Sequence, residues 1–147
     1  MMEAHYYTVD VHWKNNRKGE MTSPELTQNQ NIEVATPPQF PKGMEGIWSP
    51  EHLFTAAVSS CLMTTFLAIA ENSKLEFSDF ECKSKGKLEQ VEGKFLMTEV
   101  ILEPVVTIEN ESDREKAERV LQKSEANCLI SNSVKSKITM IPQIKLM

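Results

Sequence analysis

Residues 49–70 read SPEHLFTAAVSSCLMTTFLAIA, the longest apolar segment of the chain and the one around which the other elements must pack. Ser49 can cap the free amides at a helix start, Pro50 has the φ of a first helical residue, and Glu51 faces the positive end of the helix dipole. No charged residue follows until Glu71. The sequence therefore predicts a helix over residues 50–72 that is apolar almost all round and lies in the centre of the fold.

The uncharged run from 53 to 70 is also just long enough to span a membrane. Five of its eighteen residues are Ser or Thr. The segments on either side of it have the alternating pattern of half-buried strands, which need a helix to cover them. We therefore predict a soluble protein and no membrane association.

The rest of the chain supplies those strands and one more helix. Ahead of the long helix, the pattern predicts strands over 7–13, 18–23 and 32–35 and a proline-rich loop over 36–48. After it, the pattern predicts strands over 80–89 and 96–108, a charged amphipathic helix over 111–126 and a final strand over 137–144. This order predicts an α+β fold, with one domain over residues 1–147.

The composition and the cysteine spacing exclude several classes of function. A formal charge of −5 on 147 residues gives no electrostatic reason to bind nucleic acid or an anionic membrane. The three cysteines, at 61, 82 and 128, match no zinc spacing and form no C-x-x-C, and no histidine groups with them. We expect no metal and no organic cofactor. Residues 1–11 do not resemble a signal peptide, so we expect a cytoplasmic protein with free thiols.

The cysteines differ in their surroundings. Cys82 shares a predicted strand face with apolar residues, so we expect it to be a structural filler, a small buried residue that packs in the core and has no chemical role. Cys61 lies in the middle of the apolar helix, where a cysteine by itself is also more often filler. Cys128 follows a helix and precedes Ser131-Asn132-Ser133, so we expect it near water or a cleft.

A reactive cysteine needs its thiolate, and at pH 7 an ordinary thiol is only ~3% ionised. Cys61 is about three turns into its helix, too far for the dipole to act, so a cation must come from elsewhere. Of the three arginines, Arg114 and Arg119 belong to the charged surface helix. Arg17 lies on a predicted turn and is the candidate, although a solvated Arg17 is an equally good interpretation.

Two segments resemble the OsmC/Ohr family, the osmotically inducible and organic hydroperoxide resistance proteins. The first comprises SPEHLF at 49–54, AA at 56–57 and SSC at 59–61. The second comprises ANCLI at 126–130 and SV at 133–134. The two motifs are 67 residues apart, counted between their cysteines, and the predicted element order matches that of the family throughout.

The resemblance implies a two-layer domain, with a long buried central helix and an antiparallel sheet, that forms an intertwined homodimer. It implies a thiol peroxidase in which the thiolate of Cys61 attacks a hydroperoxide. The resulting sulfenic acid would condense with Cys128 to a disulfide, which a dithiol reductant of the lipoyl type would reopen. Arg17 matches the arginine of the family that activates the thiolate, and Glu51 matches the glutamate that orients this arginine.

The helix geometry adds an independent expectation. Glu51 and Cys61 are ten residues apart, which is about 15 Å along one helix. If both serve one site, the glutamate must come from a second copy of the helix running antiparallel. This predicts a two-fold homodimer with two sites at its interface.

Two other functions remain open at this point. The same fold could be a non-catalytic module that holds an apolar ligand in the dimer cleft. A general disulfide exchanger is a third interpretation, but it lacks the C-x-x-C motif. For the peroxidase, apolar residues near Cys61 could line an entrance suited to organic hydroperoxides, or could be plain core: Trp48, Phe54, Met63 and Phe66.

Overall fold

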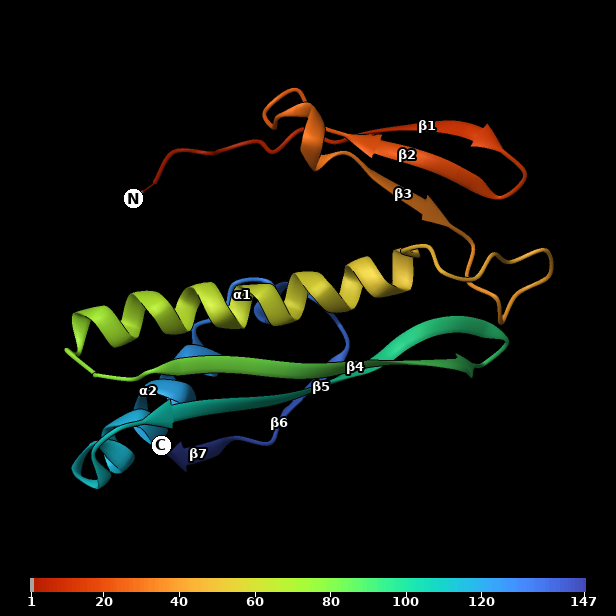
Figure 1. Ribbon diagram of the computed structural model, residues 1–147. Coiled ribbons are helices and arrows are strands. Elements are labelled where there is room, and N and C mark those ends of the chain that lie inside the picture. Colours follow the sequence, from red (N-terminus) through yellow and green to blue (C-terminus); the bar gives the residue numbers. More distant parts are fainter. Residues whose placement is uncertain (1) are drawn as a thin grey trace. The chain divides into compact units, whose positions relative to one another are not determined.

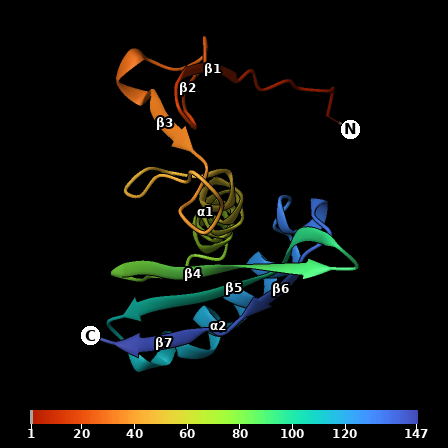
Figure 2. The same cartoon turned by 90° about the vertical axis from the view of Figure 1, so that its right-hand side faces the viewer.

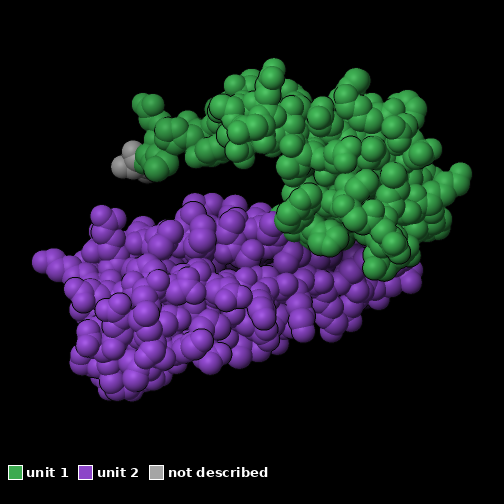
Figure 3. Space-filling view, viewed as in Figure 1, with its two compact units in different colours: residues 1–53 green, residues 54–147 purple. Residues whose placement is uncertain are grey.

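The computed structural model describes residues 2–147. They fall into two compact units, one that ends at Leu53 and one over Phe54–Met147 (Figure 3). The long helix α1 (Pro50–Asn72) begins in the first unit and continues through the second. One domain over the whole chain stays a prediction.

The first unit contains an antiparallel sheet of three strands in the order β1 (Asp10–Asn15), β2 (Lys18–Thr22) and β3 (Ile32–Ala35), as Figure 1 shows. Asn15 pairs with Lys18, so Asn16 and Arg17 form the turn between β1 and β2. Asn16 has a φ of 49°, a left-handed conformation that asparagine tolerates well. A short 3-10 turn (Gln28–Gln30) precedes β3, and the predicted loop over 36–48 follows it.

The alternation of residues 7–13 predicted a strand with a buried apolar face, and the burial was wrong. The strand starts later, at Asp10, and Val11 and Trp13 are 69% and 70% exposed. A period of two identifies side chains on one face of a strand, but it cannot say whether the same chain covers that face.

α1 has the predicted bounds, because its start is fixed by local chemistry. The N–H of His52 donates to the Ser49 hydroxyl (3.2 Å), and the N–H of Ser49 donates to Nδ1 of His52 (3.2 Å). This reciprocal pair is a capping box in which histidine replaces the usual Glu or Gln. Ser49 is fully buried.

The second unit is built on a long hairpin of β4 (Asp79–Val91) and β5 (Lys94–Ile108). Glu92 and Gly93 have φ values of 50° and 82°, which is the two-residue turn that matches strand twist in a hairpin. A 3-10 turn (Glu111–Asp113), α2 (Arg114–Ala126) and a second 3-10 turn (Ser131–Ser133) follow. β6 (Lys137–Met140) and β7 (Gln143–Leu146) then pair with β5 on the side away from β4.

The C-terminal strands correct two predictions. The single strand predicted over 137–144 is two strands, and both run parallel to β5, so the sheet is mixed and not wholly antiparallel. Leu102 pairs with Met140 and Val105 with Gln143, which leaves the pairing interrupted between these two positions. Pro104 and Pro142 lie in the interrupted stretch, where neither can donate a backbone hydrogen bond.

Alternate residues of β5 form the floor of the core. Phe66 and Ala70 of α1 pack in one cluster with Val106 of β5 and Leu121 of α2, so both helices cover the same face of the sheet. A second cluster joins Val58 and Leu62 of α1 to the other end of that β5 face. Figure 2 looks along α1, with β4, β5 and β7 below it. This packing places the middle of α1, and with it Cys61, against the interior of the second unit.

Candidate active site

The structure brings two of the four predicted site residues together. Cys61 lies on the buried side of α1 and is 8% exposed, and Cys128 lies just beyond the end of α2 and is 1% exposed. Each thiol changes the pKa of the other through a hydrogen bond between the two side chains, and both thiols are free.

The surroundings of Cys61 favour its thiolate. Burial by itself raises the pKa of the Cys61 thiol. Hydrogen bonds outweigh this effect and bring the pKa below its ordinary value: they come from the backbone of Ile130, the Cys128 thiol, the Thr65 hydroxyl and the backbone of Leu129. The contact between Cys61 Sγ and Thr65 Oγ1 is 3.8 Å long.

The segment after α2 is folded so that its amides reach this sulfur. The N–H of Asn132 donates to the Cys128 carbonyl (3.0 Å), and the Asn132 side-chain amide donates to the Ala126 carbonyl (3.2 Å). The N–H of Asn127 donates to the Lys123 carbonyl (3.1 Å), which closes the last turn of the helix. These bonds hold a tight turn around Cys128, and successive amides in such a turn form a concavity that suits an anion.

The pKa of the Cys128 thiol is changed in the opposite direction. Its burial raises its pKa, hydrogen bonds from Ser131 act against this, and the neighbouring Cys61 raises it further, so that the net pKa lies above the ordinary value. The polar sequence around Cys128 predicted a thiol near water or a cleft; the thiol is 1% exposed, so it is not open to water, and a cleft beside it stays a prediction. The side chains of Asn127, Asn132 and Ser133 donate to backbone carbonyls of this segment, and the Cys128 side chain is buried.

Arg17 and Glu51 belong to the first unit and Cys61 to the second. Arg17 is exposed on the β1–β2 turn, as predicted, and lines a hollow of about 520 Å³ with Asn16, Lys42 and Met44. Glu51 is half-buried in the first turn of α1. That these two residues act on Cys61 stays a prediction.

The sequence did not identify the groups that contact the Cys61 sulfur besides Cys128. Thr65 could have been found, because residues four apart on a helix are neighbours. The amides of Leu129 and Ile130 could not, because every residue but proline carries one.

Other candidates have structural roles. Cys82 is half-buried and packs against the second core cluster, and its pKa is raised chiefly by burial, as expected for filler. Phe66 is fully buried, so it belongs to the core and cannot line an entrance. Met63 is 39% exposed and Phe54 half-buried on α1, while Trp48 lies in the first unit.

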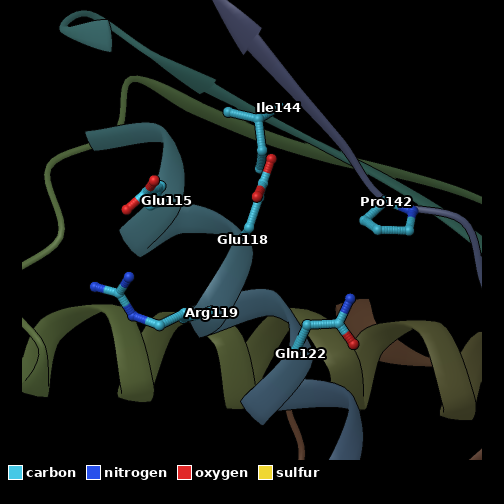
Figure 4. A pocket seen from close by; sticks show the side chains of 6 residues that line it. All are labelled: Glu115, Glu118, Arg119, Gln122, Pro142 and Ile144. Atoms are coloured by element: carbon cyan, nitrogen blue, oxygen red, sulfur yellow. The ribbon is translucent and has the colours of Figure 1, made fainter. Parts of the chain in front are cut away.

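A hollow of about 610 Å³ lies elsewhere on the second unit, between α2 and β7 (Figure 4). Its side chains come from α2, from β7 and from Pro142 just before β7, and none is a cysteine. They are Glu115, Glu118, Arg119, Gln122, Pro142 and Ile144.

The chain is similar to known proteins in sequence and in fold. A family model described as OsmC-like protein matches residues 43–142, which include both Cys61 and Cys128. The uncharacterized protein YmaD of Bacillus subtilis (strain 168) is 25% identical over 145 residues, 93% of this chain and 91% of YmaD.

Solved structures share the fold. An OsmC-like protein of unknown function from Vibrio cholerae has a TM-score of 0.81 at 24% identity, covering 95% of this chain and 99% of that one. An organic hydroperoxide resistance protein OsmC from Legionella pneumophila has a TM-score of 0.74 at 22% identity, covering 98% and 99%. At these identities the likeness establishes the fold alone.

Proposed function

The chain belongs to the OsmC-like protein family, and on this premise we propose that it is a cysteine-based peroxidase that reduces organic hydroperoxides. Hydrogen peroxide is a second substrate of the same chemistry. The observation that supports this proposal most is the contact between a buried Cys61 that favours its thiolate and a buried Cys128 that favours its thiol.

The reaction uses the two sulfurs in turn. The Cys61 thiolate attacks the distal oxygen of the hydroperoxide, the O–O bond breaks, and the alkoxide takes a proton to leave as an alcohol. Cys61 is now a sulfenic acid, and it condenses with the Cys128 thiol to a disulfide and water. A dithiol of the lipoyl type reduces this disulfide by exchange and is itself oxidised to a cyclic disulfide.

In this scheme Arg17 stabilises the thiolate and the charge that develops on the leaving oxygen, and Glu51 orients the guanidinium. The reaction requires no metal and no organic cofactor. A soluble cytoplasmic protein suits this chemistry, because a reducing compartment keeps both thiols free between turnovers. Nucleic acid and membrane have no place in the scheme.

We also propose a homodimer. Met63 and Leu67 are four residues apart on α1, so they share one face of the helix, and they are 39% and 42% exposed. A second copy of α1, packed antiparallel, would cover this face. It would also bring Glu51 of one copy toward Cys61 of the other, which one straight helix cannot do.

Mass spectrometry after one equivalent of cumene hydroperoxide tests the proposal. We expect the intact protein to lose two hydrogens and to yield a Cys61–Cys128 linked peptide. Cys61→Ser should abolish turnover with a lipoyl dithiol, and Cys82→Ser, the matched control, should leave it unchanged.

An unchanged mass, or full turnover by Cys61→Ser, would overturn the peroxidase. The remaining interpretation would then be a binding module that holds an apolar ligand. Alkylation of Cys61 at pH 6 no faster than that of a free thiol would also favour the binding module.

A further inference from the structure

The Cys61 sulfur is surrounded by donors that carry no charge. Within residues 54–147, the groups that lower its pKa are two backbone amides, one thiol and one hydroxyl. Two of these, the amides of Leu129 and Ile130, are fixed by the turn after α2. The third, the Cys128 thiol, is consumed when the disulfide forms. Thr65 is the remaining donor, and its side chain takes no part in the redox cycle.

Thr65 is placed to act only on the sulfur. It lies one helical turn beyond Cys61, half-buried, with Oγ1 3.8 Å from Sγ. A thiolate has no proton to give, so once Cys61 ionises the hydroxyl must be the donor. A hydrogen bond to a charged acceptor is about twice as strong as one between neutral groups.

The preceding residue provides a natural comparison. Thr64 is also on α1, but its hydroxyl donates to the Cys61 carbonyl (3.2 Å), the backbone bond that threonine often makes within a helix. Thr64 and Thr65 therefore have the same side chain on the same helix and contact the same cysteine. Only the hydroxyl of Thr65 contacts the sulfur.

We propose that Thr65 donates its hydroxyl hydrogen to the Cys61 thiolate and holds this sulfur, together with the amides of Leu129 and Ile130, in the charged and oriented state that attacks hydroperoxide. This inference rests on the proposed function for its last step, the attack. The first step, stabilisation of the thiolate, is a property of the resting protein.

The test is the pH profile of Cys61 alkylation in the full-length protein, followed by mass spectrometry of the Cys61 peptide after brief exposure to iodoacetamide. Valine has nearly the shape of threonine but lacks the hydroxyl. Thr65→Val should therefore move the pH profile of Cys61 alkylation to higher pH and slow alkylation at pH 7 by about three- to tenfold, since a hydrogen bond to a charged group is lost. Thr65→Ser should restore the profile, and Thr64→Val should match the wild type.

Thr65→Ala, which favours the helix, repeats the test should valine disturb the packing. An unchanged profile in both Thr65→Val and Thr65→Ala, or an equal displacement in Thr64→Val, would overturn the inference. Failure of the proposed function has a different signature. Thr65→Val would displace the profile as expected, but wild-type protein would form no Cys61–Cys128 disulfide with cumene hydroperoxide.

Discussion

Cys61 and Cys128 are best treated as one titrating pair, because each changes the pKa of the other. When Cys61 loses its proton, the Cys128 thiol becomes a donor to it. That bond favours ionisation of Cys61 and opposes ionisation of Cys128. The pair therefore enters the reaction already divided into a nucleophile and a protonated partner, which is the division that a sulfenic acid and a resolving thiol require.

The first prediction is an order of reactivity with pH. A pKa below the ordinary value keeps Cys61 as a thiolate to lower pH, so its alkylation should fall only as the pH drops through that lowered value. Cys128 and Cys82 have raised pKa values, so they should react only at pH above the ordinary range. Differential alkylation across pH 5–10, resolved by peptide, measures this order, and simultaneous reaction of all three would contradict it.

A second prediction concerns the donor on Cys128. Cys128→Ala removes both the resolving thiol and a hydrogen bond to Cys61, while Cys128→Ser removes the thiol but retains a hydroxyl donor. Both variants should stop at the Cys61 sulfenic acid after hydroperoxide, detectable by dimedone labelling. Alkylation of resting Cys61 at pH 7 should be slower in Cys128→Ala than in Cys128→Ser, by about two- to fivefold. Equal rates would show that Cys128 contributes no hydrogen bond.

Among the elements, α1 depends on its first turn. Ser49→Ala removes the hydroxyl that accepts the His52 N–H and should lower the free energy of unfolding by about 1 kcal/mol. Ser49→Thr retains a hydroxyl at the cap and should lose less stability than Ser49→Ala. Urea denaturation measures both. A loss as large in Ser49→Thr as in Ser49→Ala would place the effect in packing and not in the cap.

The contact between α1 and β4 depends on a glycine. A Cβ at Gly86 would meet Thr55 Oγ1 of α1 and approach Met97 Cε to 2.7 Å. Gly86→Ala should therefore destabilise the protein by about 1–3 kcal/mol, the usual cost of overpacking. In a double-mutant cycle, Thr55→Ala should relieve part of this loss, because it removes the nearest atoms. Strict additivity would mean that the helix and the strand do not meet here.

The elements show what the sequence could and could not determine. Ser49-Pro50 determined the start of α1 because a cap and a proline act on their own neighbours. The interruption at Pro142, which divides the final strand into β6 and β7, was not predicted, because apolar residues on both sides of it continue the strand pattern. The contact of Cys61 with Cys128 could be inferred only through the resemblance, since hydrophobic periodicity says nothing of which loop covers which helix.

For the whole molecule, the prominent feature is the amount of apolar surface left open by a single chain. α1 buries one side in the core of the second unit and exposes Met63 and Leu67 on another. Val11 and Trp13 of β1 are also exposed. Within each unit, exposed apolar side chains that share one face of an element are typical of a protein interface. The length and composition of α1 would also suit a membrane-spanning helix. The packing of Val58, Leu62 and Phe66 in the core supports a soluble fold instead.

The last prediction therefore concerns assembly, measured by light scattering after size-exclusion chromatography. Wild-type protein should elute as a dimer of 16.7 kDa chains. Leu67→Lys places a charge on the exposed face of α1, where an interface would have to bury it without a partner, so the dimer should dissociate. Ile141→Lys makes the same change at a residue that is 54% exposed beyond β6, away from α1, and should leave the dimer intact.

If Glu51 acts on the partner's site, Leu67→Lys should also lose hydroperoxide turnover while its Cys61 retains contact with Cys128. A monomeric wild type with full turnover would exclude the shared site, and the glutamate would then have no route to the sulfur.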